Sequence, residues 1–220
     1  MKVYSLPKSI KAFIFDIDST LYTNQAYAYE QVDCQIRKFA EEQGISNDKA
    51  RNMIAEFRRN YSMENQGRKI SLGNTLVSFG VPISKSVQWR KTLLEPGDFL
   101  KYDIRLVKEI TMLKEKAKVI CVTNNPVLPA RKTLEAIGVS SLIPDIVGLD
   151  TCFKSKPAIE PFETAINILK VPASSCVAVG DRYDMDIALP LAMGMGGILV
   201  KGVEEVYQIY KTCYTERYGN

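Results

Sequence analysis

The sequence predicts an α/β fold in which a doubly wound parallel sheet is interrupted, after its first strand, by an all-helical insertion. Three observations lead to this prediction: short apolar runs without alternation, segments of helical period between them, and one long stretch without a strand pattern. Strands covered on both faces of a parallel sheet read as continuous apolar runs, and strands that alternate with helices are typical of α/β domains.

The expected strands are short apolar runs that end in polar residues. They are residues 11–18 (KAFIFDID), 117–125 (AKVICVTNN), 144–150 (PDIVGLD), 175–181 (SCVAVGD) and a weaker run at 196–201 (GGILVK). Between them, apolar residues recur every three or four positions over 103–116, 127–137 and 160–170, which indicates helices. In an open α/β sheet, ligands bind beyond the carboxyl ends of the strands, where these polar residues lie.

The stretch from residue 23 to residue 99 is expected to be helical throughout. Two prolines, Pro82 and Pro96, are expected to interrupt helices, and Ser46 is expected to be an N-cap. The expected helices are Tyr27–Gly44, Ser46–Tyr61, 71–80 and 84–94. We therefore expect a core domain formed by 1–22 with 100–220, and a small second domain formed by 23–99.

Composition excludes several classes of function. The chain has 220 residues, 46% hydrophobic and 25% charged, as in ordinary globular proteins. Its net charge of +4 is spread over scattered basic residues, so nucleic acid is not an expected partner. No segment has the roughly 20 apolar residues that span a bilayer, and the N-terminus lacks a signal-peptide pattern. We therefore expect a cytoplasmic protein without membrane association; the oligomeric state is not predicted.

The absence of histidine limits the available chemistry further. It rules out serine–histidine and cysteine–histidine hydrolases and imidazole metal sites. The five cysteines are odd in number and lack metal-ligand spacing, so reduced thiols are expected. Acid–base chemistry is left to carboxylates, lysine or tyrosine.

Acidic residues at two strand ends predict a magnesium site. Asp16 and Asp18 close the first strand and, two residues apart, point the same way in extended backbone. Asp181 ends a later strand, and Asp186 follows it. Close carboxylates repel one another unless a cation is present, and oxygen ligands without histidine or thiolate favour Mg²⁺. The alternative for an isolated pair is a capping aspartate beside a solvated one.

Two other strand ends offer groups that bind anions. Thr123 follows the run Val119–Val122, with Asn124 and Asn125 behind it, and Lys156 lies in KSKPAIEPF. A hydroxyl, backbone N–H groups and an ammonium suit phosphate oxygens. Taken singly, a threonine after a strand is commonly a turn residue, and a lysine is commonly a solvated surface group.

The order of these motifs resembles the haloacid dehalogenase (HAD) superfamily. Asp16-x-Asp18-x-Thr20, Thr123, Lys156-Pro157 and Gly180-Asp181 with Asp186 match its four motifs over nearly the whole chain. The helical insertion matches the family's cap, placed after the first motif of a Rossmann-like core. FDIDSTLY and VGDRYDMDI look like the phosphatase branch with pyrimidine 5′-nucleotidase-like members.

The resemblance implies a role for each motif position. Asp16 would be the nucleophile that forms an aspartyl-phosphate, and Asp18 the general acid and base. Thr123, Asn124 and Lys156 would bind the substrate. Asp16, Asp18 (through its main-chain carbonyl), Asp181 and Asp186 would hold Mg²⁺. Asp184 has no counterpart in the motif and is interpreted as a solvated carboxylate.

The function expected from this resemblance is a phosphatase for a small metabolite such as a nucleotide or sugar phosphate. An acid at position 18 favours phosphoryl transfer over dehalogenation. Two alternatives stay open: a sugar phosphomutase on the same core, and a non-catalytic phosphate-binding protein. Tyr22, Asn24 and Tyr27 are either contacts to the leaving group or packing residues, and Gly194, Gly196 and Gly197 are interpreted as a turn.

Overall fold

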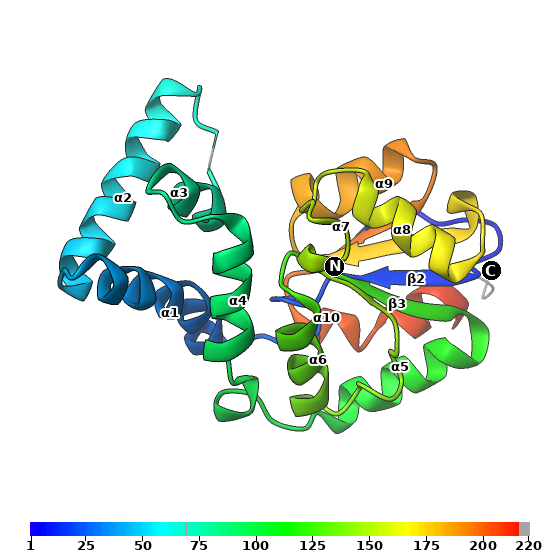
Figure 1. The fold of residues 1–220 in the computed structure, drawn as a ribbon. Coiled ribbons are helices and arrows are strands. Elements are labelled where there is room, and N and C mark those ends of the chain that lie inside the picture. Colours follow the sequence, from blue (N-terminus) through cyan, green and yellow to red (C-terminus); the bar gives the residue numbers. More distant parts are fainter. Residues whose placement is uncertain (69, 216–220) are drawn as a thin grey trace. The chain divides into compact units, whose positions relative to one another are not determined.

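The computed structural model describes residues 1–68 and 70–215. Lys69, predicted to belong to the helical insertion, and residues 216–220, predicted to belong to the core, lie outside the described residues. The chain divides into two compact units (Figure 1). One consists of Met1–Gln25 and the chain from Glu95 onward, and the other of Ala26–Leu94.

The first unit is built on a sheet that, over the described residues, has six strands in the order β1-β6-β5-β2-β3-β4. The strands are β1 Lys2–Ser5, β2 Ala12–Phe15, β3 Lys118–Val122, β4 Ile146–Val147, β5 Cys176–Gly180 and β6 Gly196–Leu199. β2 pairs in parallel with β3 and β5, whereas β1 runs antiparallel to β6 at the edge. The carboxyl ends of β5, β2 and β3 are therefore neighbours.

Helices cover both faces of this sheet, as the doubly wound prediction requires. α8 and α9 lie on one face, and α5, α6 and α10 lie on the other (Figure 1). The helices are α5 Ile104–Lys116, α6 Val127–Ala136, α7 Leu149–Cys152, α8 Glu160–Leu169, α9 Ala188–Ala192 and α10 Val203–Val206. Short turns complete the unit: the 3₁₀ turns η1 Pro96–Asp98 and η2 Ala173–Ser175, and the π-helical turns η3 Tyr183–Ile187 and η4 Lys211–Thr215.

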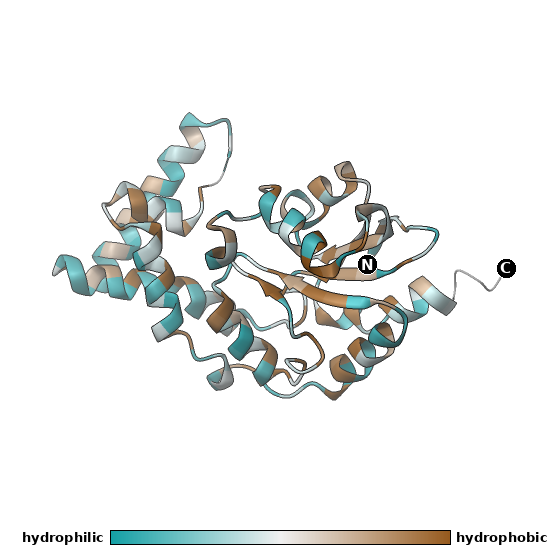
Figure 2. Cartoon of the chain, turned by 45° about the vertical axis from the view of Figure 1, so that its right-hand side comes forward, coloured by the Kyte–Doolittle hydropathy of each residue, from teal (hydrophilic) through white to brown (hydrophobic). Residues whose placement is uncertain are grey.

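Successive side chains of β2 pack on opposite faces of the sheet. Ala12 and Ile14 join a buried cluster with Phe162 of α8. Phe13 and Phe15 stack on each other at 6.0 Å between ring centroids, and Phe13 also meets Tyr214 edge-on. Burial of both faces explains why the run lacks alternation. The central strands of the sheet are accordingly drawn largely in the hydrophobic colour in Figure 2.

Strand β1 was not predicted from the sequence. It has four residues, is mostly exposed and carries no apolar run, so it lacks the signal of a buried strand. Its partner β6 begins at Gly196, where a Cβ would lie 2.7 Å from the Ser5 carbonyl oxygen. The turn interpretation therefore holds for Gly194, whose φ is +84°, but Gly196 and Gly197 belong to a strand.

The described residues of the second unit form helices joined by short turns. They are α1 Gln25–Gln43, which begins at the last residue of the first unit, α2 Asn47–Glu64, α3 Leu72–Ser78 and α4 Ile83–Leu93. Phe39, Ala50, Ile54, Leu76 and Trp89 are among its buried core residues. The Ser46 hydroxyl accepts a hydrogen bond from the Lys49 N–H, as the predicted N-cap requires. The role of this unit as a cap stays a prediction.

A buried carboxylate joins α1 to α2. Asp33 on α1 is 3% exposed, and its side chain accepts hydrogen bonds from Arg51 Nε at 2.8 Å and Nη2 at 3.0 Å. Arg37 on α1 pairs with the same carboxylate. The hydrogen bonds from Arg51, followed by those from Arg37, lower the pKa of Asp33 to about 2, although burial opposes them. The ion pair therefore stabilises the helical unit at neutral pH.

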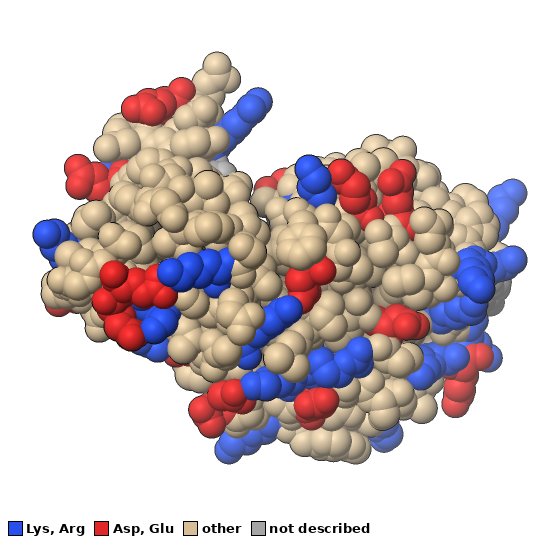
Figure 3. All heavy atoms as spheres, viewed as in Figure 1, with Lys and Arg blue, Asp and Glu red and all other residues tan. Residues whose placement is uncertain are grey.

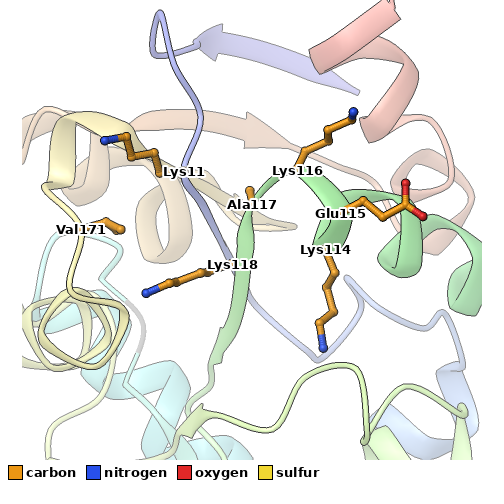
Figure 4. A pocket seen from close by; sticks show the side chains of 7 residues that line it. All are labelled: Lys11, Lys114, Glu115, Lys116, Ala117, Lys118 and Val171. Carbon is orange, nitrogen blue, oxygen red and sulfur yellow. The ribbon is translucent and has the colours of Figure 1, made fainter.

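The amino ends of β2 and β3 carry a hollow of about 470 Å³ rather than catalytic groups (Figure 4). Lys11, Lys114, Lys116 and Lys118 line it. Lys114 and Lys116 occupy the last turn of α5, where positive charge offsets the partial negative charge of a helix C-terminus. Lys118 Nζ donates to the Leu169 carbonyl at the end of α8, at 2.8 Å. Helix termini thus account for Lys114, Lys116 and Lys118.

Charged side chains of both signs are interspersed on the face drawn in Figure 3. Among the described residues, no helix combines the length and apolar character needed to cross a membrane.

Replacing Asp33 by Asn should lower the free energy of unfolding of the helical unit by about 1–3 kcal/mol, because Arg51 and Arg37 lose a charged partner. Trp89, the single tryptophan of the chain, lies in this unit's core, so urea unfolding followed by its fluorescence reports this unit. The folded-state pKa lies below the unfolded value of about 3.9. The stabilisation should therefore be complete above pH 4 and disappear as the pH falls toward 2.

The matched control is Glu41→Gln, which removes an exposed ion pair with Lys38 and should change the unfolding free energy by less than about 1 kcal/mol. An Asp33→Asn variant as stable as the wild type at pH 7 would contradict the assignment.

Candidate active site

Asp16 stands directly after β2, in the middle of the sheet's carboxyl edge. Its N–H donates to the Val179 carbonyl of β5 at 2.8 Å, which extends the strand pairing by one residue. The side chain is 6% exposed. One carboxylate oxygen accepts from the Thr20 hydroxyl at 3.2 Å, so the turn that follows β2 helps to orient it.

Lys156 is buried against two carboxylates. Its Nζ lies 2.6 Å from Asp16 Oδ1 and 2.6 Å from Asp186 Oδ1, and the residue is 3% exposed. Asn124 fixes its backbone: the amide oxygen accepts from the Lys156 N–H at 2.7 Å, and the amide nitrogen donates to the Lys156 carbonyl at 3.2 Å. The loops after β3 and before α8 therefore hold the ammonium in place.

The loop after β5 brings Asp181 and Asp186 to the same edge. Asp186 belongs to the π-helical turn η3 and accepts from the Arg182 N–H at 3.0 Å. Gly180 lets it approach the strand, because a Cβ on Gly180 would lie 2.3 Å from Asp186 Cβ. The absence of a side chain at position 180 therefore makes room for the Asp186 carboxylate. Asp184, in the same turn, is exposed.

Burial dominates the electrostatics of this cluster. It raises the pKa of the Asp16 carboxyl, which Lys156 opposes and Asp186 reinforces. Burial and the neighbouring Asp186 likewise raise the pKa of Asp181. For Lys156, burial alone would lower the pKa of the ammonium, but the Asp16 and Asp186 carboxylates raise it above its ordinary value. Lysine 156 is thus held in its charged form.

The donor set of the cluster fits a hard divalent cation. Oxygens of Asp16, Asp181 and Asp186 all lie within 4.8 Å of one another. Three ionised carboxylates against the single ammonium of Lys156 would leave two negative charges in a largely buried space. A cation that prefers carboxylate oxygen would neutralise them.

Asp18 has a different environment from Asp16, although only Ile17 separates them. It is half-buried, and its Oδ2 accepts from Asn125 Nδ2 at 2.9 Å and from the Thr123 hydroxyl at 3.2 Å. Its Oδ1 accepts from the Tyr22 hydroxyl at 2.6 Å. Neutral donors therefore orient this carboxylate, whereas an ammonium binds Asp16.

The structure brings the predicted site residues together, but three side chains have partners that sequence reasoning missed. Asn124, predicted to bind substrate, has its amide against the Lys156 backbone. Tyr22 and Asn125 each donate a hydrogen bond to Asp18. In the sequence, Tyr22 stands four residues after Asp18, and Asn125 stands two residues after Thr123. Those spacings were the only signals available. Of the other candidates, Asn24 donates to the Phe99 carbonyl at 2.8 Å, and Tyr27 is buried.

Comparison with known proteins identifies the family. The sequence pattern of the haloacid dehalogenase-like hydrolases matches residues 10–194, which include every residue of the cluster described above. The chain belongs to this family. Asp16 lies near the beginning of the matched span and Asp186 near its end, so the span contains all the acidic residues of the site.

Relatives and solved structures agree with this HAD assignment. A phosphoglycolate phosphatase of Rhodospirillum rubrum is 38% identical over 73 residues, which is 33% of this chain and 30% of that protein. The chain thus aligns with only about a third of the length of the curated relatives it matches. A HAD phosphatase from Thermococcus onnurineus has a TM-score of 0.62 and 20% identity, covering 92% of this chain and 97% of that one.

A β-phosphoglucomutase from Clostridium difficile has a TM-score of 0.54 at 18% identity, covering 92% of this chain and 99% of that one. At these identities, the two structures show a shared fold. The neighbours include both a phosphatase and a mutase, so the finer resemblance to the pyrimidine nucleotidase branch is not confirmed.

Replacing Gly180 by Ala should lower the free energy of unfolding of the first unit by about 1–3 kcal/mol, because the new Cβ forces Asp186 away from the strand. Differential scanning calorimetry of the full chain measures this change. Gly97→Ala is the matched control in the same unit, since a Cβ there meets no atom within 4 Å. Equal midpoints for the two variants would show that the close approach of Asp186 is not required.

Proposed function

We propose that this protein is a Mg²⁺-dependent phosphatase that hydrolyses a small phosphate monoester through an aspartyl-phosphate on Asp16. The observation that carries the proposal is the buried Asp16 carboxylate, held by Lys156 at 2.6 Å beside Asp181 and Asp186. Membership of the HAD-like hydrolases and the phosphoglycolate phosphatase relatives support it.

The first half of the reaction forms the phosphoenzyme. An Asp16 oxygen attacks phosphorus, the bond between phosphorus and the ester oxygen breaks, and Asp18 gives its proton to the departing oxygen. Lys156, already adjacent to Asp16, would hold a non-bridging oxygen of the transferring group, and Thr123 would hold another. In the second half, Asp18 takes a proton from water, which attacks phosphorus and releases inorganic phosphate and Asp16.

The carboxylates of Asp16, Asp181 and Asp186 would hold Mg²⁺ together with the main-chain carbonyl of Asp18. When bound, the cation offsets negative charge between the nucleophile and an anionic substrate. The helical insertion is part of this proposal as a cap, which would exclude water while the phosphoryl group is transferred.

Two substrate classes are proposed for the first assays. The motifs FDIDSTLY and VGDRYDMDI support pyrimidine nucleoside monophosphates. The relatives support 2-phosphoglycolate, the substrate that their name gives. A sugar phosphate such as glucose 1-phosphate completes the panel, because a phosphomutase on this core would isomerise it instead of releasing phosphate.

The purified protein should release inorganic phosphate from 4-nitrophenyl phosphate or a member of this panel with Mg²⁺, and chelation should abolish the release. Asp16→Asn should reduce turnover at least about 10³-fold, because an amide is a poor nucleophile. Asp184→Asn is the matched control: an exposed acid of the η3 turn, with turnover close to wild type. Equal turnover in Asp16→Asn and wild type would remove Asp16 from the nucleophile's role.

Magnesium should also stabilise the folded protein in the absence of substrate. At ten times its dissociation constant, a bound ion adds about 1.4 kcal/mol to the free energy of unfolding. Asp181→Asn should abolish this response. Without the ion, the same variant should be at least as stable as wild type, since one of three mutually repelling carboxylates is gone.

Calorimetry with and without Mg²⁺ compares the stabilities of wild type and Asp181→Asn, with Asp184→Asn again as the control. An unchanged magnesium response in Asp181→Asn would place the ion elsewhere.

A further inference from the structure

We propose that Tyr22 and Asn125 are positioning residues for Asp18, and that they determine how well this enzyme expels strongly basic leaving groups. The inference rests on the proposed function, in which Asp18 protonates the departing oxygen. It adds two residues to which the four motifs give no role and assigns them a measurable part of the reaction.

The geometry places a donor on each oxygen of Asp18. The Tyr22 hydroxyl lies 2.6 Å from Oδ1, and the Asn125 amide nitrogen lies 2.9 Å from Oδ2. A carboxylate bound through one oxygen alone still rotates about its Cβ–Cγ bond. Donors on both oxygens fix that rotation and therefore the direction in which Asp18 presents a proton.

Both donors are themselves held in place. Tyr22 is 5% exposed and directly follows the turn after β2, in which Thr20 and Leu21 are fully buried. The N–H of Asn125 donates to the Thr123 hydroxyl at 3.1 Å, and its carbonyl accepts from the Leu149 N–H at 2.9 Å. Because its N–H and its carbonyl are both hydrogen-bonded, the Asn125 backbone is fixed, and this limits the freedom of its side-chain amide. The donors thus meet the requirement that a catalytic group be supported by rigid neighbours.

The neutrality of these donors separates Asp18 from the nucleophile. Asp16 contacts the Lys156 ammonium, which favours a carboxylate that attacks. Tyr22 and Asn125 orient Asp18 without forming a buried ion pair with it. The two carboxylates are separated by one residue, yet their partners suit them to different steps, as in other enzymes that use paired carboxylates.

This arrangement predicts a dependence on the leaving group. An alkyl oxygen departs as a strongly basic alkoxide and needs a well-placed proton, whereas 2,4-dinitrophenolate departs without one. General acid catalysis contributes roughly 10²- to 10⁴-fold where it is required. Loss of one positioning bond should therefore reduce kcat/KM, which reports formation of the phosphoenzyme, by about 10- to 100-fold for alkyl phosphates, and by much less for 2,4-dinitrophenyl phosphate.

The test measures kcat and KM of wild type, Tyr22→Phe and Asn125→Ala with Mg²⁺ on a series of monoesters of decreasing leaving-group acidity. The series runs from 2,4-dinitrophenyl through 4-nitrophenyl and phenyl phosphate to an alkyl phosphate. The expected result for both variants is a fall in kcat/KM that grows along the series. Tyr22→Phe keeps the ring, and Asn125→Ala independently removes the shorter of the two hydrogen bonds to Oδ2, leaving that from Thr123.

Tyr29→Phe is the matched control. It removes the same hydroxyl from a tyrosine that is 60% exposed in the helical unit and donates to Asp33 at 3.2 Å. Its profile should follow wild type at every leaving group. The thermal midpoint of each variant, measured alongside, separates lost folding from lost positioning.

The outcomes distinguish this inference from the proposed function beneath it. A wild type without turnover on any monoester overturns both. A wild type that is active while Tyr22→Phe and Asn125→Ala lose the same factor of kcat/KM on every ester overturns the positioning role alone, because a merely structural defect is indifferent to the leaving group. Unchanged kcat/KM in both variants on the alkyl phosphate overturns it as well.

Discussion

The ammonium of Lys156 between Asp16 and Asp186 is the interaction on which the site depends. Burying ionised carboxylates costs several kcal/mol each unless an opposite charge accompanies them, and Lys156 meets both at 2.6 Å. The parallel sheet order β5-β2-β3-β4 explains why the three residues meet, since Asp186 follows β5, Asp16 follows β2 and Lys156 follows β4, and the chain leaves all these strands at one edge. Asn124 clamps the lysine's backbone, and Gly180 leaves room for Asp186. Asn124 and Gly180 therefore both support the contact of Lys156 with the two carboxylates.

Two carboxylates of one motif acquire different properties from their surroundings. Asp16 is buried and paired with a cation, whereas Asp18 is half-buried and bonded to a phenol, an amide and a hydroxyl. Phosphoryl transfer through an enzyme-bound intermediate needs one carboxylate to attack and another to move a proton. This division of surroundings matches that need without any histidine in the chain. A cation at the remaining carboxylates would complete the charge balance.

The sequence predicted the strands that end at the site, because β2, β3 and β5 are buried on both faces and read as unbroken apolar runs. It also predicted which acids gather there, since Asp16 and Asp181 stand at strand ends. It did not predict β1, an exposed edge strand of four residues. Nor did it predict the partners of Asn124 and Asn125, because hydrogen bonds to residues 32 and 107 positions away depend on tertiary geometry that no local pattern encodes. Tyr22 lies only four residues after Asp18, but the sequence does not show which way its ring turns in this irregular segment.

The central claim, that Asp16 carries the phosphoryl group, is tested most directly by trapping. The protein would be quenched during turnover of 4-nitrophenyl phosphate with Mg²⁺, reduced with borohydride and digested for mass spectrometry. An acyl-phosphate is reduced to the alcohol, so the peptide containing Asp16 should carry homoserine at that position. The account predicts this product in wild type and none in Asp16→Asn. Turnover without homoserine at residue 16, or with it at another aspartate, would contradict the account.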